Sequence, residues 1–154
     1  MPNLRQTFTP KLNTMLEELL GNLNWLHLLV AAIAYFAVGA LWYSPVLFSN
    51  AWANAVGLKT DDPELKKTFP IALLGSFLMM CLTVVALGII QQKIPAVGIS
   101  GAMKVGLFFG LCFSAMGIGI SYIYQRKPLV LYLIDCGYHI VGCCIASIII
   151  VLWP

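Results

Sequence analysis

The stretch "LVLYLIDCGYHIVGCCIASIIIVLW", residues 129–153, is a long apolar run near the C-terminus of this chain. It is long enough to cross the hydrocarbon core of a bilayer, which takes about 20 mostly apolar residues in a helix. The same stretch carries an aspartate, a histidine and three cysteines: Asp135, His139, Cys136, Cys143 and Cys144. The chain therefore places ionisable side chains where the surrounding solvent is expected to be lipid.

Three further apolar stretches precede it, at residues 25–43, 71–90 and 105–124. The chain of 154 residues is 60% hydrophobic and 10% charged, whereas a soluble domain carries about 25% charged residues. Its net charge of +3 is scattered along the chain, which argues against nucleic-acid binding. The sequence thus predicts an all-α membrane protein, a four-helix transmembrane bundle with the lipid bilayer as its main partner.

Two segments outside the four spans are expected to lie at the membrane surface. Residues 1–24, ahead of the four-span domain at 25–154, form an amphipathic segment for contact with lipid or protein. Its apolar positions follow the helical period opposite Glu17 and Glu18: Leu12, Met15, Leu16, Leu19, Leu20 and Leu23. The charged connection at 44–70 contains Ser44 and Pro45, typical of a helix start, and Gly57, typical of a helix end. A short interfacial helix is predicted there.

Small residues line one face of the third span. They recur at steps of four, four, three and four along the chain: Gly106, Gly110, Ser114, Gly117 and Ser121. Such residues let membrane helices approach closely, and Gly142 in the last span is expected to act in the same way. The third span is therefore predicted to be the central packing helix. Only residues 125–128 separate it from the last span, so these two form an antiparallel hairpin.

The last span has a polar stripe. At 100° per residue, its polar and small side chains fall within an arc of about 120°: Tyr132, Asp135, Cys136, His139, Gly142, Cys143 and Ala146. The opposite side is aliphatic and is expected to face lipid. Asp135 and His139 lie one helical turn apart, so their side chains can pair. Pairing would lower the cost of burying a charge in the bilayer, about 2.5–3.5 kcal/mol on insertion scales.

Three interpretations of the stripe compete. The favoured one is a polar clasp, in which Asp135, His139 and a tyrosine (Tyr132 or Tyr138) hold the helices in register. The second is a path for a proton or a small-molecule substrate in a small proton-coupled transporter. The third is a metal site formed by His139, Cys136 and Cys143. The sequence shows no nucleophile–base pair, so neither catalytic residues nor a cofactor are predicted.

Two stretches together resemble the integral membrane family called domain of unknown function 1761. "NWLHLLVAAIAYFAVGALWYSPVLFSNAW", residues 24–52, is similar to its opening span and the Trp-Tyr-Ser-Pro turn that follows. "LYLIDCGYHIVGCC", residues 131–144, is similar to its last span with a Gly-Tyr-His core. The resemblance covers residues 24–153 and implies a four-span, bacterial-type membrane protein without an established activity. It adds weight to Trp42, Tyr43, Ser44, Pro45, Gly137, Tyr138 and His139.

The expected protein is therefore a small structural or accessory bundle that forms homo-oligomers. A bacterial inner membrane is the expected location. Four spans place both termini on the same side, while nearly equal numbers of basic residues on the two sides leave the orientation open.

Overall fold

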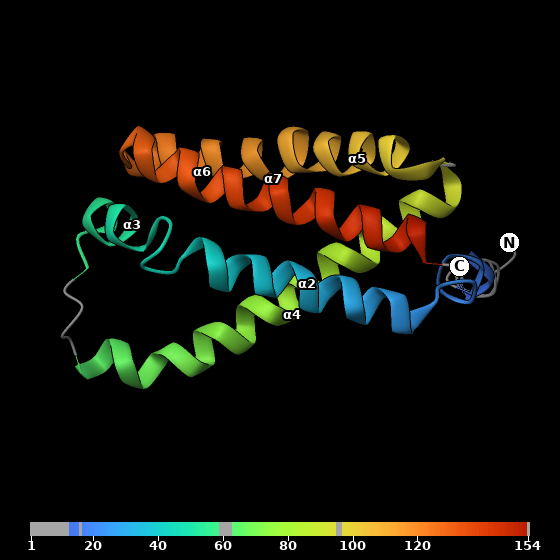
Figure 1. The fold of residues 1–154 in the computed structure, drawn as a ribbon, viewed down its shortest axis with the longest axis horizontal. Coiled ribbons are helices and arrows are strands. Elements are labelled where there is room, and N and C mark those ends of the chain that lie inside the picture. The colour runs from blue at the N-terminus through green and yellow to red at the C-terminus, as the bar shows by residue number, and fades with distance from the viewer. Residues whose placement is uncertain (1–12, 16, 59–62, 95–96, 154) are drawn as a thin grey trace, which may run out of the picture.

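Four long helical segments run along the molecule in the computed structural model, which describes residues 13–15, 17–58, 63–94 and 97–153 (Figure 1). Each is long and apolar enough to cross a membrane. They are α2 (Trp25–Trp42), α4 (Pro63–Lys93), the run of α5 (Gly98–Phe109), η1 (Gly110–Ala115) and α6 (Met116–Gln125), and α7 (Leu129–Leu152). The described ranges contain no strand. The predicted all-α protein with four membrane spans is confirmed.

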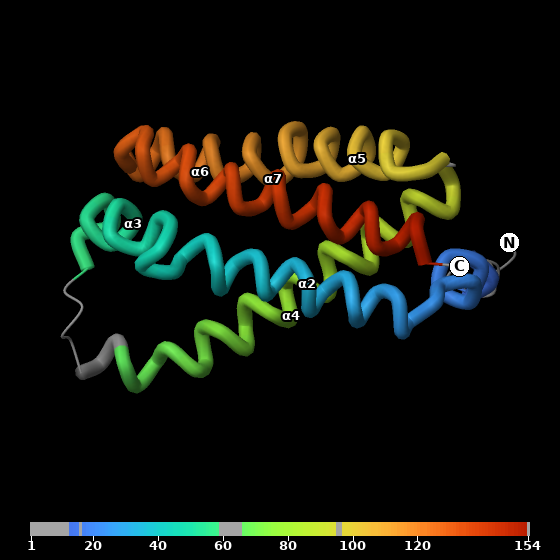
Figure 2. Tube along the Cα trace, in the orientation of Figure 1, coloured from blue at the N-terminus to red at the C-terminus, as the bar shows by residue number. Residues whose placement is uncertain are grey.

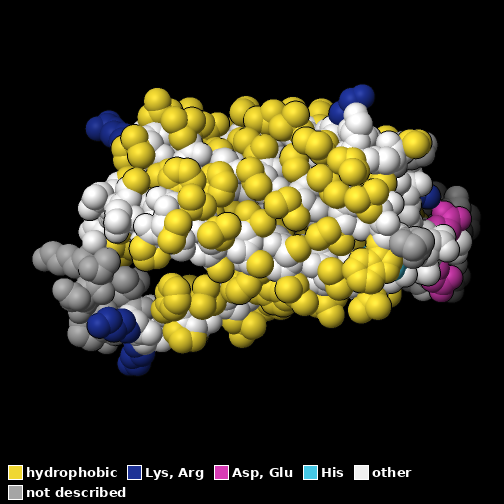
Figure 3. Space-filling view, in the orientation of Figure 1, with side chains coloured by type: hydrophobic (Ala, Val, Ile, Leu, Met, Phe, Trp, Pro, Cys, Tyr) yellow, Lys and Arg dark blue, Asp and Glu magenta, His cyan; other side chains and the backbone are white. Residues whose placement is uncertain are grey.

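Apolar side chains cover the flanks of the molecule, as lipid contact requires (Figure 3). The charged side chains visible in that view lie mainly toward its two ends. This arrangement matches a protein whose middle is in hydrocarbon and whose ends reach water.

The second span begins earlier than its hydropathy suggests. Helix α4 starts at Pro63 and continues through Pro70, so the helix includes the last part of the predicted 44–70 connection. Hydropathy detects the apolar part of a helix, whereas polar residues such as Lys66 and Lys67 can extend the same helix into water. The first half of α4 lies apart from α2, and the two helices come together further along α4 (Figure 2).

The short helix predicted between Ser44 and Gly57 is present, with a later start, and its position at the membrane surface stays a prediction. Helix α3 (Ser49–Val56) follows a turn over residues 43–48, in which the Ser44 carbonyl accepts hydrogen bonds from the amides of Leu47 and Ser49. Ser44 and Pro45 therefore open a turn and not a helix. Gly57 ends α3 with a φ of 77°, a left-handed conformation that glycine adopts without strain.

At the N-terminal segment, residues 13–15 and 17–20 are helical, while Leu12 and Leu16 of the predicted apolar face lie outside the described residues. Leu23 is buried and belongs to the core, and Leu20 packs against that core. The apolar side of this segment therefore meets the protein at least at its end.

The central helix is α7, not the third span. It contacts α2, α3, α4, α5, η1 and α6, and Figure 1 shows it between α2 and the third span. Small residues explain this position, because Gly137 and Gly142 let aromatic rings from α2 approach from one side. On the other side, α7 meets Gly106 and Gly110 of the third span. Close approach on two faces gives α7 the most neighbours.

A π-helical turn interrupts the third span at Gly110–Ala115. Such a turn holds an extra residue, so the residues after it are rotated by about 100° relative to an uninterrupted α-helix. A Cβ added at Gly106 or Gly110 would meet the backbone of α7, whereas one added at Gly117 would meet nothing within 4 Å. Ser121 is exposed. The predicted single face of small residues therefore contacts α7 only in its first half.

Candidate functional site

Asp135 is the centre of a polar cluster on α7. Its side chain is 8% exposed. Oδ1 accepts hydrogen bonds from the Tyr43 hydroxyl at 2.7 Å and from the Trp52 indole Nε1 at 3.1 Å. Oδ2 accepts one from the Tyr122 hydroxyl at 2.6 Å. These donors come from the residue after α2, from α3 and from α6, so one carboxylate links α7 to three other parts of the chain.

The three donors suit a carboxylate group. An ionised carboxylate only accepts hydrogen bonds, and the Trp52 indole can only donate. Bonds that end on a charged group contribute about 1.5–3 kcal/mol each, and together they can offset the roughly 2.5–3.5 kcal/mol cost of a charge inside the membrane. The cluster therefore explains how Asp135 is accommodated in an apolar helix.

His139, one turn further along α7, bonds to a different partner. Its Nδ1 lies 2.8 Å from the hydroxyl of Tyr35, a residue of α2 that is almost completely buried. The same hydroxyl lies 3.9 Å from Sγ of Cys143. Asp135 and His139 thus share a face of α7 but take part in separate contacts. A direct Asp135–His139 bond stays a prediction.

The two predicted tyrosines lie in different places. Tyr138 is part of the cluster: its ring centroid is 5.4 Å from that of Tyr35 and 5.5 Å from that of Tyr43. Its hydroxyl donates to the thioether sulfur of Met80 at 3.2 Å, which ties α7 to α4. Tyr132 faces α6, where its ring comes 3.0 Å from the position that a Cβ on Gly119 would occupy.

Aromatic rings rest on glycines throughout this region. A Cβ on Gly137 would lie 2.9 Å from the ring of Trp42, and the Trp42 indole donates to the carbonyl of Ile134 at 3.0 Å. Gly142 lies under the Tyr35 ring, too close for any Cβ. The Trp42–Tyr43 pair and the Gly137–Tyr138–His139 run, which the sequence placed in two separate motifs, therefore pack against each other.

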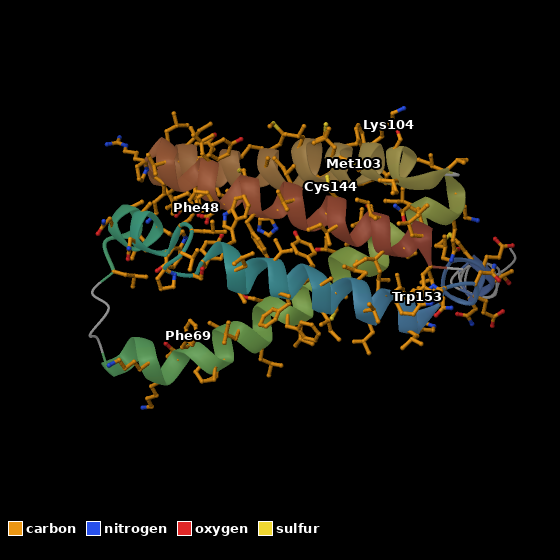
Figure 4. The ribbon with its side chains drawn as sticks, viewed as in Figure 1. Phe48, Phe69, Met103, Lys104, Cys144 and Trp153 are labelled. Carbon is orange, nitrogen blue, oxygen red and sulfur yellow. The ribbon has the colours of Figure 1, made fainter. Side chains whose placement is uncertain are left out.

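The cysteines contribute weak contacts between helices. The Cys136 thiol donates to the carbonyl of Ala115 at 3.8 Å. The Cys144 thiol donates to the carbonyl of Met103 at 3.9 Å, and both labelled residues are seen in Figure 4. All five cysteines are free. Among the described residues, no group of three His, Cys, Asp or Glu side chains is placed to hold a metal ion.

Several residues of the cluster were not predicted as site residues. Tyr35 could have been found, because it shares a face of α2 with Gly39 and Trp42 at helical spacing. Ser147 also continues the spacing of Asp135, His139 and Cys143 by one more turn. No sequence pattern places Trp52 beside Asp135, since this contact depends on the turn between α2 and α3.

Comparison with known proteins supports one relationship. The sequence model of the family described as "Protein of unknown function (DUF1761)" matches residues 26–151. No curated protein and no solved structure matches the chain.

Proposed function

Because the chain belongs to the DUF1761 family of proteins of unknown function, its role has to be inferred from its own residues, and we propose that it is a small structural or accessory membrane protein. In this proposal the Asp135 cluster is a clasp that fixes the helices in register. The carrying observation is the set of three donors on Asp135, from Tyr43, Trp52 and Tyr122. His139 extends the clasp to α2 through Tyr35.

The clasp acts mainly on the end of the molecule that contains α3. This helix of eight residues has no buried residue of its own. A short helix without a buried face gains little from apolar packing, so a bond from Trp52 to Asp135 has a large share in holding it. The same carboxylate holds Tyr122 near the end of α6. The clasp would therefore fix both α3 and the hairpin between the last two spans.

Substitution of Tyr122 by phenylalanine tests the clasp. Tyr122→Phe keeps the ring and removes one hydrogen bond to Asp135, so we expect the free energy of unfolding in detergent micelles to fall by about 1–2 kcal/mol. Tyr124→Phe is the matched control, because Tyr124 lies on the same helix and is 86% exposed. Thermal melts of both variants and of the wild type give the comparison. Equal melting temperatures for the two variants would contradict the clasp.

We also propose that the protein forms homo-oligomers in a bacterial inner membrane, with both termini on one side. The rings of His27, near the start of α2, and Trp153, after α7, lie 5.0 Å apart, which supports a common side for the two ends.

Most described residues along the first half of α4 are exposed, including Phe69, which is labelled in Figure 4. Such a helix leaves room for a second copy as well as for lipid. Light scattering of the detergent complex measures the number of chains; a single chain per complex would contradict the oligomer.

A further inference from the structure

Four polar side chains follow one another along a single face of α7. Asp135, His139, Cys143 and Ser147 are each separated by four residues, or about one helical turn. At 1.5 Å per residue they cover about 18 Å of helix, more than half of a hydrocarbon core that is about 30 Å thick. The clasp explains the role of Asp135 and the contact of His139 with Tyr35. It gives no reason for the row of polar residues to continue to Ser147.

The middle of the stripe is connected through Tyr35. Its hydroxyl lies 2.8 Å from Nδ1 of His139 and 3.9 Å from Sγ of Cys143. A tyrosine hydroxyl can donate one hydrogen bond and accept another at the same time. A single side chain from α2 thus bridges two successive turns of α7, at a position that is 1% exposed.

The far end of the stripe contains buried polar atoms without partners. Ser147 is fully buried, and within the described part of the chain its Oγ has no hydrogen-bond partner. The same holds for Oε1 of Gln91 on α4, whose amide nitrogen donates to the Ser147 carbonyl at 3.3 Å. An unpaired buried polar atom costs about 1–3 kcal/mol. A water molecule that bonds to both oxygens would remove this cost, and two or more polar partners are what a buried water needs.

We propose that this face of α7 is a proton path across the membrane, formed by Asp135, His139, Tyr35, Cys143, Ser147 and Gln91. Water molecules complete the path where neighbouring turns are not directly bonded. Side chains one turn apart have Cβ atoms about 5–6 Å from each other, a gap that one water can bridge. The path extends beyond the clasp, which uses only its Asp135 end and the contact of His139 with Tyr35.

Each step of the path moves only protons. His139 accepts a proton on one ring nitrogen and releases the proton held on the other, which is the property that makes histidine a proton shuttle. The Tyr35 hydroxyl accepts a proton on its oxygen as its own proton passes to the next acceptor. Only N–H, O–H and S–H bonds form and break, and each group regains its proton from the group before it. A pH difference across the membrane drives the movement.

Proton flux into liposomes tests the path. Purified wild-type protein is reconstituted into liposomes that contain a pH-sensitive dye. The pH outside the liposomes is then lowered, with valinomycin and K⁺ present to balance charge. We expect the wild type to acidify the interior faster than protein-free liposomes do. We expect Ser147→Ala and Tyr35→Phe to reduce the flux to the protein-free rate. Ser121→Ala, at an exposed serine of α6, is expected to conduct like the wild type.

The Ser147→Ala variant separates conduction from folding. Ser147 Oγ makes no hydrogen bond within the described chain, so its removal is expected to leave the melting temperature unchanged or slightly raised. Tyr35→Phe keeps the ring that rests on Gly142. A wild-type flux equal to that of protein-free liposomes would overturn the path, as would wild-type flux in either variant. The clasp is judged separately by the melting temperature of Tyr122→Phe, so the two proposals can fail independently.

Discussion

Replacement of Asp135 by alanine is expected to destabilise the protein strongly. Three hydrogen bonds to a charged acceptor, at about 1.5–3 kcal/mol each, disappear together. The variant no longer buries a charge, which returns about 2.5–3.5 kcal/mol. The bonds outweigh that gain, so we expect the free energy of unfolding to fall by about 2–5 kcal/mol.

Chemical or thermal unfolding in detergent micelles measures this loss. Asp135→Asn is the graded comparison, because its amide keeps one acceptor oxygen and is expected to lose less stability than alanine. Hydrogen exchange gives a local readout: in Asp135→Ala the amides of α3 should exchange faster, since Trp52 loses its acceptor. An Asp135→Ala protein that melts like the wild type, with α3 equally protected, would show that the cluster has no structural role.

Introduction of a single methyl group at Gly106 is also expected to destabilise the protein. A Cβ at this position would lie 2.6 Å from Cα and 2.8 Å from the amide nitrogen of Cys144, and 2.7 Å from the carbonyl oxygen of Cys143. Backbone atoms cannot rotate away as a side chain can, so α5 and α7 would have to separate. Such overpacking costs about 1–3 kcal/mol, and we expect Gly106→Ala to lower the free energy of unfolding by that amount.

Gly117→Ala is the matched control for Gly106→Ala. Both glycines belong to the third span, but a Cβ on Gly117 would meet nothing within 4 Å. Alanine is the better helix former by about 0.8–1 kcal/mol in soluble hosts, so Gly117→Ala is expected to be neutral or slightly stabilising. The two variants should therefore shift the unfolding transition in opposite directions or differ clearly in size. Equal shifts would contradict the close contact of α5 with α7.

Gly106 and Gly117 also show that residue spacing alone does not predict which residues of a span contact the neighbouring helix. The spacing from Gly106 to Ser121 fits one face of a regular α-helix. The π-helical turn at Gly110–Ala115 changes the phase of every residue after it, and it brings Tyr122 to Asp135. Spacing alone contains no signal for that turn, because the extra residue is accommodated locally where two helices pack.

Hydropathy is enough to identify the class of molecule, and the cost of a charge in lipid is enough to single out Asp135 as a candidate residue. Long apolar stretches have no stable place except in a bilayer, so the four spans could be recognised from hydropathy. An aspartate in such a stretch is costly enough to stand out, and helical periodicity placed Asp135, His139 and Cys143 on one face.

Which groups meet that face of α7 depends on tertiary packing. Trp52 reaches Asp135 only because the chain turns back between α2 and α3, and Tyr122 reaches it only because the third span changes phase. The hydrogen bond of His139 to Tyr35 joins residues 104 positions apart in the chain. Periodicity is a local property of one helix, whereas these contacts depend on how separate helices are rotated and shifted against one another. That arrangement is set by the packing of glycines against rings and backbone, which is specified only when all four spans are assembled.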